Sequence, residues 1–333
     1  MTRNYTVKEC HQKESIFNYI HLGTNLPVLD SFKKYIYHEI DLMGCFSLVF
    51  TDNQTNLIIG HSLLYQWEEI LYFAFFYAKD ASFKNTRIVV EQIERKATEL
   101  GCTEVLGPVN LPPFIYGFGF SEKNSEKTIF AAAPYTDPAY IQIFQDLGYI
   151  SPEKLLHFRV PFIKKEYKKV YDLFHPDLTQ PSSWKFKFLE MANRLFPSEI
   201  QVTPNRAPTI DDMIDFHNKF SDSNCFFMMR YPESEKIIGI GWGFPNPFDL
   251  KVNGKAKSYV FFGAAVEKEH QKSGVITQNY NMWSEELLKI GATHGEGFTN
   301  ETNYGAINMF KSWNGVHTRT HVLMHKQLVK GDN

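Results

Sequence analysis

An internal repeat constrains this chain more than any other feature of its sequence. The segment Leu100–Asn110 aligns without a gap on Ile290–Asn300, and four residues are identical between the two copies. The identical pairs are Gly101 with Gly291, Thr103 with Thr293, Gly107 with Gly297, and Asn110 with Asn300. A match this short needs support from the sequence around it.

The sequence before each copy has the same pattern. An apolar run, Ile70–Ala78 in the first half and Ser258–Val266 in the second, is rich in aromatic residues and typical of a strand buried on both faces. Each run is followed by apolar residues at helical spacing, up to Leu100 in the first copy and Ile290 in the second. Strand, loop, helix, glycine and strand therefore occur twice, which predicts two duplicated domains.

The rest of the chain fits around these two units. Hairpins are predicted before each buried strand, over Ser47–Gln66 in the first half and through an Asn253-Gly254 turn in the second. A helix is predicted over Ser183–Leu195, between the halves. We predict an α/β fold in which each domain is a twisted mixed sheet flanked by helices. The predicted parts are an N-terminal domain over 1–164, a connector over 165–205 and a C-terminal domain over 206–333.

Composition excludes several classes of protein. A length of 333 residues suggests about two domains, and a net charge of -2 gives no surplus for binding nucleic acid, so none is expected. The four cysteines lie far apart without zinc-finger spacing, so neither disulfides nor a metal site is predicted. The N-terminus is polar, and no apolar run approaches the roughly 18 residues of a membrane span. We expect a cytoplasmic protein without membrane contact.

The segment Val266–Ile276 contains the clearest candidate binding motif. It lies between a predicted strand and a helix N-terminus, where unpaired N–H groups and the helix dipole favour an anion such as a pyrophosphate. Gly274 allows close approach of the backbone, and Lys272 adds positive charge. Gln271 and Ser273 supply further hydrogen-bond donors. The alternative is an ordinary solvated loop that caps a helix.

This segment resembles the pyrophosphate loop of the GCN5-related N-acetyltransferase (GNAT) superfamily, which reads Gln/Arg-x-x-Gly-x-Gly/Ala. Gln271 and Gly274 match it, whereas Ile276 replaces its last small residue. The resemblance implies acetyl-CoA or another acyl-CoA as cofactor, with pantetheine along the end of the strand and pyrophosphate on the loop. The implied cofactor-binding residues are Ala264, Ala265, Val266, Gln271, Lys272, Ser273, Gly274, Val275, Ile276 and Asn303.

The resemblance also indicates where the reaction would occur. In the family the next strand turns away and leaves a wedge for the acyl group, and His294–Thr299 would be that strand. The following helix begins Asn-x-x-Ala, which Asn303 and Ala306 match, but Phe310 stands where a Tyr usually protonates the leaving thiolate. Near the chain end, His321–Leu328 suits the terminal strand of the same domain.

Three residues are candidates for proton transfer. Glu296 and His294 are candidate general bases because the attacking amine must lose a proton, and they share one face of a regular strand. Tyr304 is a candidate acid displaced from the usual position. The alternative for each is an ordinary surface polar residue. Asn303 suits a helix cap as well as a cofactor contact.

The first half has a weaker cofactor pattern and a motif of its own. Its loop Lys79–Thr86 has no glycine, so close approach to a phosphate is not expected, and Phe144 again stands where a Tyr is usual. Gly107–Asn110, the aromatic stretch Gly117–Phe120 and then Ala133–Tyr135 resemble an uncharacterised bacterial acyltransferase-like group.

Three functions are compatible with these patterns. The leading hypothesis is an N-acyltransferase in which an amine of a small molecule or peptide attacks the acyl-CoA thioester directly, with catalysis by positioning and by backbone N–H groups. The second is a non-catalytic binding or structural protein, which the replacements Ile276, Phe310 and Phe144 favour. The third, suggested by tandem-domain relatives, is an aminoacyl-tRNA-dependent transferase, against which the lack of basic charge counts.

Overall fold

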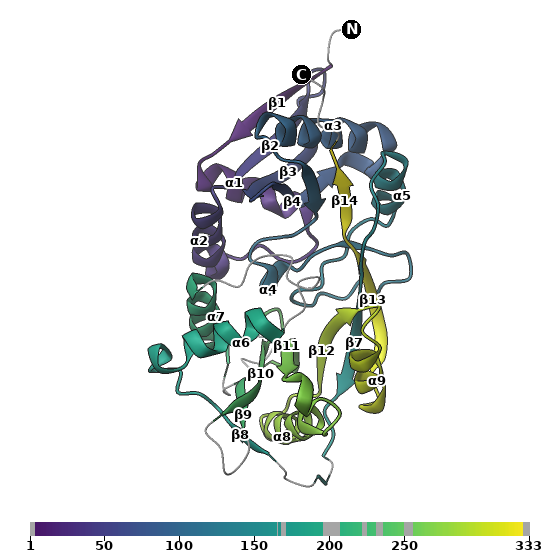
Figure 1. The fold of residues 1–333 in the computed structure, drawn as a ribbon. Helices are drawn as coiled ribbons and strands as arrows, with labels where there is room; N and C mark the ends of the chain where they lie inside the picture. Colours follow the sequence, from purple (N-terminus) through teal and green to yellow (C-terminus); the bar gives the residue numbers. More distant parts are fainter. Residues whose placement is uncertain are drawn as a thin grey trace. The chain divides into compact units, whose positions relative to one another are not determined.

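The chain forms two compact units, which are described separately (Figure 1). The computed structural model describes residues 4–164, 166–167, 171–195, 207–221, 225–230, 236–249 and 256–328. The first unit comprises residues 1–156 and 319–333, and the second comprises residues 157–318. The predicted Asn253-Gly254 turn and parts of the predicted connector lie outside the described residues.

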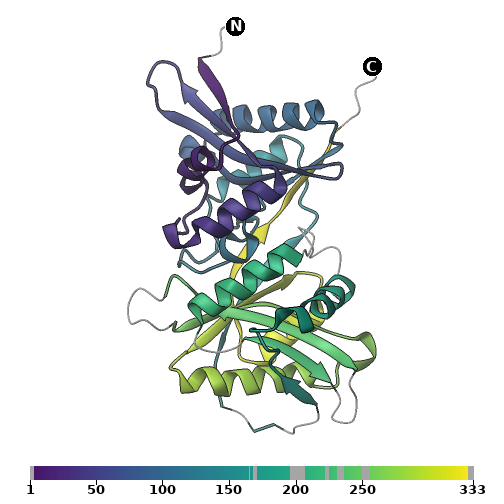
Figure 2. The same cartoon turned by 90° about the vertical axis from the view of Figure 1, so that its left-hand side faces the viewer.

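A six-stranded mixed sheet organises the first unit. Its elements in chain order are β1 (Tyr5–Cys10), α1 (Lys13–Ile20), α2 (Lys33–Met43), β2 (Phe46–Asp52), β3 (Ile58–Trp67), β4 (Ile70–Ala78), α3 (Phe83–Glu99), β5 (Glu104–Gly107), α4 (Pro113–Tyr116), β6 (Phe120–Ser121), α5 (Ala139–Asp146) and β14 (Met324–Gln327). The strand order is β1-β2-β3-β4-β5-β14, in which only β4 and β5 are parallel neighbours. Figure 2 shows α3 on one face of the sheet and α1 and α2 on the other.

The core of the first unit follows from its sequence pattern. β4 is apolar at every position because helices cover both faces of the sheet. On one face, Val89, Ile93 and Ala97 of α3 recur at helical spacing and join the cluster that contains Phe73 of β4. Gly101 follows α3 with a φ of 73°, a left-handed conformation that glycine adopts without strain.

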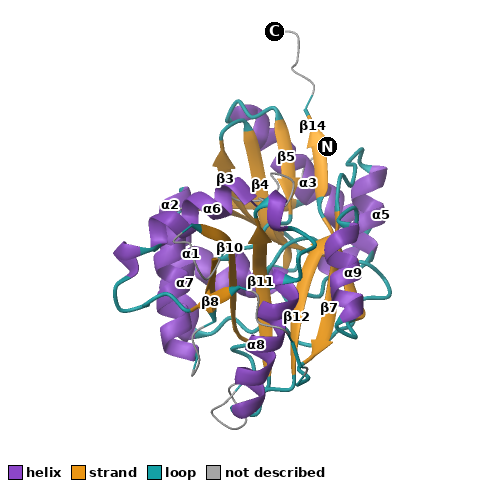
Figure 3. Cartoon of the chain, turned by 60° about the horizontal axis from the view of Figure 1, so that its bottom comes forward, coloured by secondary structure: helices purple, strands orange, loops and turns teal. Residues whose placement is uncertain are grey.

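The second unit is built on a larger sheet with the order β6-β13-β7-β12-β11-β10-β9-β8, of which β6 belongs to the first unit. The remaining elements are β7 (Lys154–Pro161), β8 (Asp172–Phe174), α6 (Lys185–Leu195), α7 (Ala207–Phe220), β9 (Phe226–Arg230), β10 (Ile237–Pro245), β11 (Ser258–Val266), α8 (Val275–Lys289), β12 (His294–Asn300), α9 (Tyr304–Ser312) and β13 (Val316–Val322). Figure 2 shows α8 on the opposite face of the sheet from α6 and α7, and Figure 3 shows the strands between them.

The last strand of the chain lies in the first unit. β14 pairs antiparallel with β5, from Met324 opposite Gly107 to Gln327 opposite Glu104, and Met324 is fully buried in the first core. The sequence instead suggested that His321–Leu328 is the terminal strand of the C-terminal domain. That expectation is corrected: β14 satisfies the backbone groups of β5 that would otherwise form a bare edge, and Met324 is its buried apolar residue.

The unit boundaries fall inside two strands. β7 begins in the first unit and passes into the second between Leu156 and His157, and β13 returns to the first unit between Thr318 and Arg319. Residues 319–333 therefore group with the first unit and not with the predicted domain over 206–333. No helix among the described residues has the length and apolar character needed to cross a membrane.

Candidate functional site

β11 and β12 diverge halfway along their length. They pair in parallel from Ser258 opposite His294 to Phe261 opposite Gly297, and the pairing ends there. A β-bulge lies at the same level of β11, since Phe261 and Gly263 pair with consecutive residues of β10 and leave Phe262 between them. A bulge bends a strand and increases its twist, which carries the end of β11 away from β12.

The loop after β11 exposes backbone at the start of α8. Gly274 is the N-cap of α8 with a φ of 85°, and Lys272 also has a positive φ of 64°. A β-carbon on Gly274 would meet no atom within 4 Å, so the backbone is open on that side. Among the described residues, no acceptor is paired with the N–H groups of Ser273, Gly274 and Val275. Such groups, at the positive end of a helix dipole, are suited to an anion.

The charges around the loop leave it positive. Arg194 of α6 donates two hydrogen bonds of 2.8 and 2.6 Å to Glu267, and these bonds hold the pKa of that carboxyl below its usual value. Glu269 lies 3.2 Å from the ammonium of Lys236. Lys272 is exposed and has no carboxylate partner among the described residues, so its charge is available to a ligand.

Other predicted side chains of the loop turn back on the protein. The amide of Gln271 donates to the carbonyl of Val266 at 3.4 Å, and the hydroxyl of Ser273 donates to the carbonyl of His270 at 2.5 Å. Ile276 packs against the apolar cluster that includes Val266 and Val275. These side chains shape the loop. The groups of the loop that face outward are its backbone and the side chain of Lys272. Before the loop, Ala264 is exposed and Ala265 is half-buried.

The start of α9 is a capped helix. The Oδ1 of Asn303 accepts a hydrogen bond from the N–H of Ala306 at 3.1 Å, which is the geometry of an N-cap. Tyr304 is 73% exposed. Phe310 is buried and stacks on Phe158 with ring centroids 5.2 Å apart. An aromatic core contact therefore occupies the position where the family usually has a Tyr.

The two candidate bases on β12 are in different environments. Glu296 is 1% exposed, and its Oε1 accepts hydrogen bonds from Nη2 and Nε of Arg159 at 2.6 and 2.8 Å. His294 is half-buried, with its Nδ1 2.9 Å from the hydroxyl of Thr293. Two N–H groups of Arg159 meet one oxygen of Glu296, so that oxygen already accepts two charge-assisted hydrogen bonds.

Arg159 was not singled out from the sequence. It lies on β7, in which His157 and Arg159 alternate with the apolar residues Phe158 and Val160. Two polar residues two positions apart, among apolar neighbours, indicate a strand face with specific polar contacts. This alternation was visible in the sequence. The partner of Arg159, Glu296 on β12, is more than a hundred residues away, so the pair could not be read from it.

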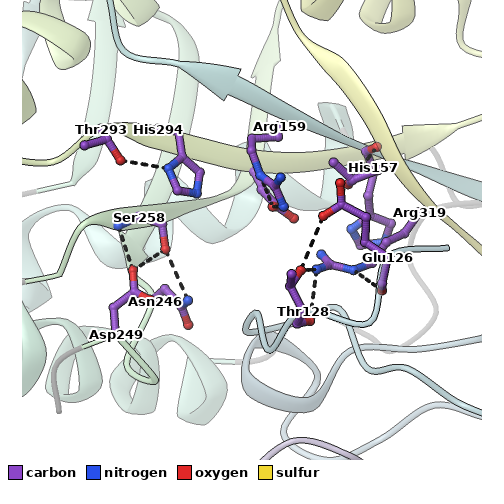
Figure 4. Close-up of polar contacts among 12 residues, drawn as sticks. Glu126, Thr128, His157, Arg159, Asn246, Asp249, Ser258, Thr293, His294 and Arg319 are labelled. Atoms are coloured by element: carbon purple, nitrogen blue, oxygen red, sulfur yellow. Dashed lines mark hydrogen bonds and ion pairs between the residues drawn. The ribbon is translucent and has the colours of Figure 1, made fainter. Parts of the chain in front are cut away.

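The beginning of β11 is held by a second polar group. Asp249 accepts a hydrogen bond from the N–H of Ser258 at 2.8 Å and another from its hydroxyl, and Asn246 donates to that hydroxyl at 3.2 Å (Figure 4). Among the described residues, no cluster of three or more His, Cys, Asp or Glu side chains is arranged to hold a metal ion.

Sequence comparisons give no relative, and structure comparisons give many. No family model matches the chain, and no curated protein sequence matches it. The chain is similar to a GCN5-related N-acetyltransferase from Sphaerobacter thermophilus, with a TM-score of 0.62, 9% identity and coverage of 98% of this chain and 96% of that one.

Two further solved structures are similar over nearly the whole chain. A tandem GNAT protein from the clavulanic acid biosynthesis pathway has a TM-score of 0.59 at 9% identity and covers 98% of this chain and 100% of that one. A probable N-acyltransferase from Enterococcus faecalis has a TM-score of 0.56 at 6% identity, over 97% of this chain and 72% of that one. The chain therefore has the fold of the GCN5-related N-acetyltransferases in its tandem form.

Proposed function

We propose that the chain is an acyl-CoA-dependent N-acyltransferase whose cofactor site lies in the second unit. Because a fold alone does not define a reaction, the proposal depends on the site. The observation that carries it is the open backbone at Gly274, with unpaired N–H groups at the start of α8, directly after a strand that diverges from its parallel neighbour.

The residues of the second unit suit each part of the cofactor. The backbone of Ser273–Val275 and the ammonium of Lys272 would hold the pyrophosphate, and the free edge of Ala264–Val266 would hold the pantetheine amides. The bound cofactor supplies a thioester that an amine can attack. A backbone N–H near the bulge at Phe262 would polarise the thioester carbonyl, which places catalysis mainly in positioning and hydrogen bonding.

The acceptor is proposed to be an amine of a small molecule or peptide. The nitrogen of the amine forms a bond to the acyl carbon, the carbon–sulfur bond breaks, and the thiolate leaves. Phe310 offers no hydroxyl to that thiolate, so the proton would come from solvent or from Tyr304, which is exposed at the start of α9. The proton lost by the amine would pass to water or to His294.

Calorimetric titration with acetyl-CoA and CoA tests the cofactor site. We expect binding in the micromolar range that weakens at least tenfold in Lys272→Glu and in Gly274→Trp, because one reverses a charge and the other fills the open backbone. Lys84→Glu is the matched control, since Lys84 is exposed in the first turn of α3 and its reversal changes net charge equally. Unchanged affinity in both loop variants would contradict the site.

A second candidate is a protein that binds the cofactor without catalysis. The pairing of Glu296 with Arg159 and the burial of Phe310 favour it, because one oxygen of Glu296 is engaged by Arg159 and Phe310 has no proton to give. Binding of acetyl-CoA without transfer to any amine in a panel of polyamines, amino sugars, amino acids and peptides would favour this candidate. Steady turnover of one amine would exclude it.

A further inference from the structure

The motif that follows β5 has no part in the proposed site. All fourteen residues from Gly107 to Phe120 are buried in the structure. The segment folds back on itself, because the N–H of Asn110 donates to the carbonyl of Gly117 at 3.0 Å and the N–H of Gly119 donates to that of Pro108 at 2.8 Å. A loop buried to this extent needs a reason in the structure, since loops normally lie on the surface.

β4 and β5 of the first unit repeat the geometry of β11 and β12. Their parallel pairing ends at Tyr72 opposite Leu106, and β4 then has a bulge opposite β3. The internal repeat, together with the two registers, places Phe75 of β4 at the position of Gly263 in β11. The buried segment begins where the two strands diverge.

Side chains and backbone of the first unit satisfy the free edge of β4. The N–H of Val109 donates to the carbonyl of Phe73 at 2.9 Å, and the N–H of Phe75 donates to Oδ1 of Asn110 at 2.7 Å. The amide of Asn110 in turn donates to the carbonyl of Tyr116 at 3.0 Å, which fixes its orientation. His61 lies on β3, which pairs with the other edge of β4; its Nδ1 is 3.0 Å from the carbonyl of Phe75 and must be the donor.

The last residue of β4 is satisfied in the same way. The hydroxyl of Tyr140 on α5 donates to the carbonyl of Ala78 at 2.9 Å and accepts from its N–H at 3.0 Å. In the second unit, the only side-chain hydrogen bond to the backbone of Ala264–Val266 among the described residues is the 3.4 Å contact from Gln271. Asn300, the counterpart of Asn110, bonds to Thr302 instead.

We infer that residues 107–120, with Asn110 at their centre, together with Tyr140 of α5, plug the first unit at the place where the second unit would take its cofactor. The side-chain oxygen of Asn110 accepts a hydrogen bond from the N–H of Phe75, the position at which a thioester carbonyl would bind in the second unit. The hydroxyl of Tyr140 pairs with the backbone of Ala78, at the part of the strand edge that would bind pantetheine. The first unit is then a closed scaffold. Together with the proposed function, this means that the chain binds one acyl-CoA, and binds it in the second unit.

Hydrogen exchange of the full chain tests the plug without any ligand. The N–H groups of Phe75 and Ala78 should be protected, and Asn110→Ala should speed exchange at Phe75 about tenfold, as expected for one lost buried hydrogen bond. Asn300→Ala is the matched control and should leave Phe75 unchanged. If Asn110→Ala prevents folding, Tyr140→Phe removes a single oxygen atom and should speed exchange at Ala78.

Wild-type exchange at Phe75 and Ala78 as fast as at exposed amides would overturn the plug.

The same measurement with saturating CoA separates this inference from the proposed function. We expect new protection only near Ala264–Ile276, with one CoA bound per chain. Protection of residues 73–82, or two CoA bound per chain, would overturn the closed first unit. Absence of CoA binding would contradict the proposed function, while the exchange of Phe75 and Ala78 would still decide whether the plug exists.

Discussion

At the scale of single residues, the pairing of Glu296 with Arg159 predicts more about stability than about catalysis. Glu296 is almost fully buried, so removal of Arg159 takes a positive charge away from a carboxylate inside the second unit. We expect Arg159→Ala to lower the free energy of unfolding by about 3 kcal/mol, measured by urea denaturation. Arg87→Ala is the control, because Arg87 forms an exposed pair with Glu91 and its loss should cost less than about 1 kcal/mol.

Glu296→Gln then distinguishes a structural carboxylate from a general base. If the carboxylate is held by Arg159 for structure, the variant should lose stability but keep turnover within about tenfold of the parent protein. The measurement is kcat/KM with an accepted amine, together with the urea midpoint. A loss of a hundredfold or more in a variant that still folds and binds acetyl-CoA would make Glu296 the base.

Two buried histidines predict how the first unit responds to acid. Burial lowers the pKa of both His61 and His321 from 6.5 to about 4, although each ring contacts a backbone carbonyl. Between pH 6.5 and 4 the unfolded chain binds a proton at each position and the folded chain does not. Stability is therefore lost as the pH falls through this window, by up to about 3 kcal/mol for each histidine.

Urea denaturation between pH 7 and pH 4 measures this loss. His61→Gln removes one titrating group, so its stability should fall less steeply with acid than that of the parent, by about 1.4 kcal/mol per pH unit inside the window. His11→Gln is the control because the side chain of His11 is 68% exposed. An equal slope in His61→Gln and the parent protein would show that burial of His61 does not contribute to acid sensitivity.

At the scale of elements, the glycines of β10 predict how closely α8 packs on the sheet. A β-carbon at Gly243 would lie 2.4 Å from the ring of Trp283 and 2.6 Å from the carbonyl of Val260, whereas one at Gly241 would find its nearest neighbour at 3.4 Å. We expect Gly243→Ala to destabilise the protein by about 1–3 kcal/mol, because overpacking moves α8. Gly241→Ala should be close to neutral in the same denaturation experiment, and equal losses would refute the packing argument.

Elements with a strong local pattern were predictable from the sequence, and contacts between distant segments were not. β4 and β11 are predicted by apolar runs, and α8 is predicted by apolar residues at helical spacing, all within about 20 residues of sequence. The divergence of β11 from β12 and the open backbone at Gly274 lie where the family resemblance put them, although the role of the loop remains a proposal. The Arg159 pair and the contact of Asn110 with Phe75 depend on segments that meet only in the folded sheet, so no local pattern specifies them.

At the scale of the whole molecule, the repeat correctly predicted a tandem fold but not the assignment of the last strand. Both halves share the strand-loop-helix-strand order. Nothing in the sequence His321–Leu328 shows whether this strand pairs with β5 or with its counterpart in the second half, β12. Tertiary contacts place β14 in the first unit. Met324 enters the first core, His325 lies 2.8 Å from Glu104, and Lys326 lies 2.8 Å from Glu94 on α3. The chain end is therefore part of the first unit's stability.

Truncation measures that contribution. A chain ended after Leu323 lacks β14, so β5 becomes an open edge and the core around Met324 loses a fully buried side chain. We expect limited proteolysis to cut this variant first within residues 4–156, at a protease concentration that leaves the parent protein intact. A chain ended after Leu328 keeps β14 and is the matched control. If the shorter chain resists proteolysis in residues 4–156 as well as the control does, β14 is dispensable, and the first unit must derive its stability from β1–β5 and their helices alone.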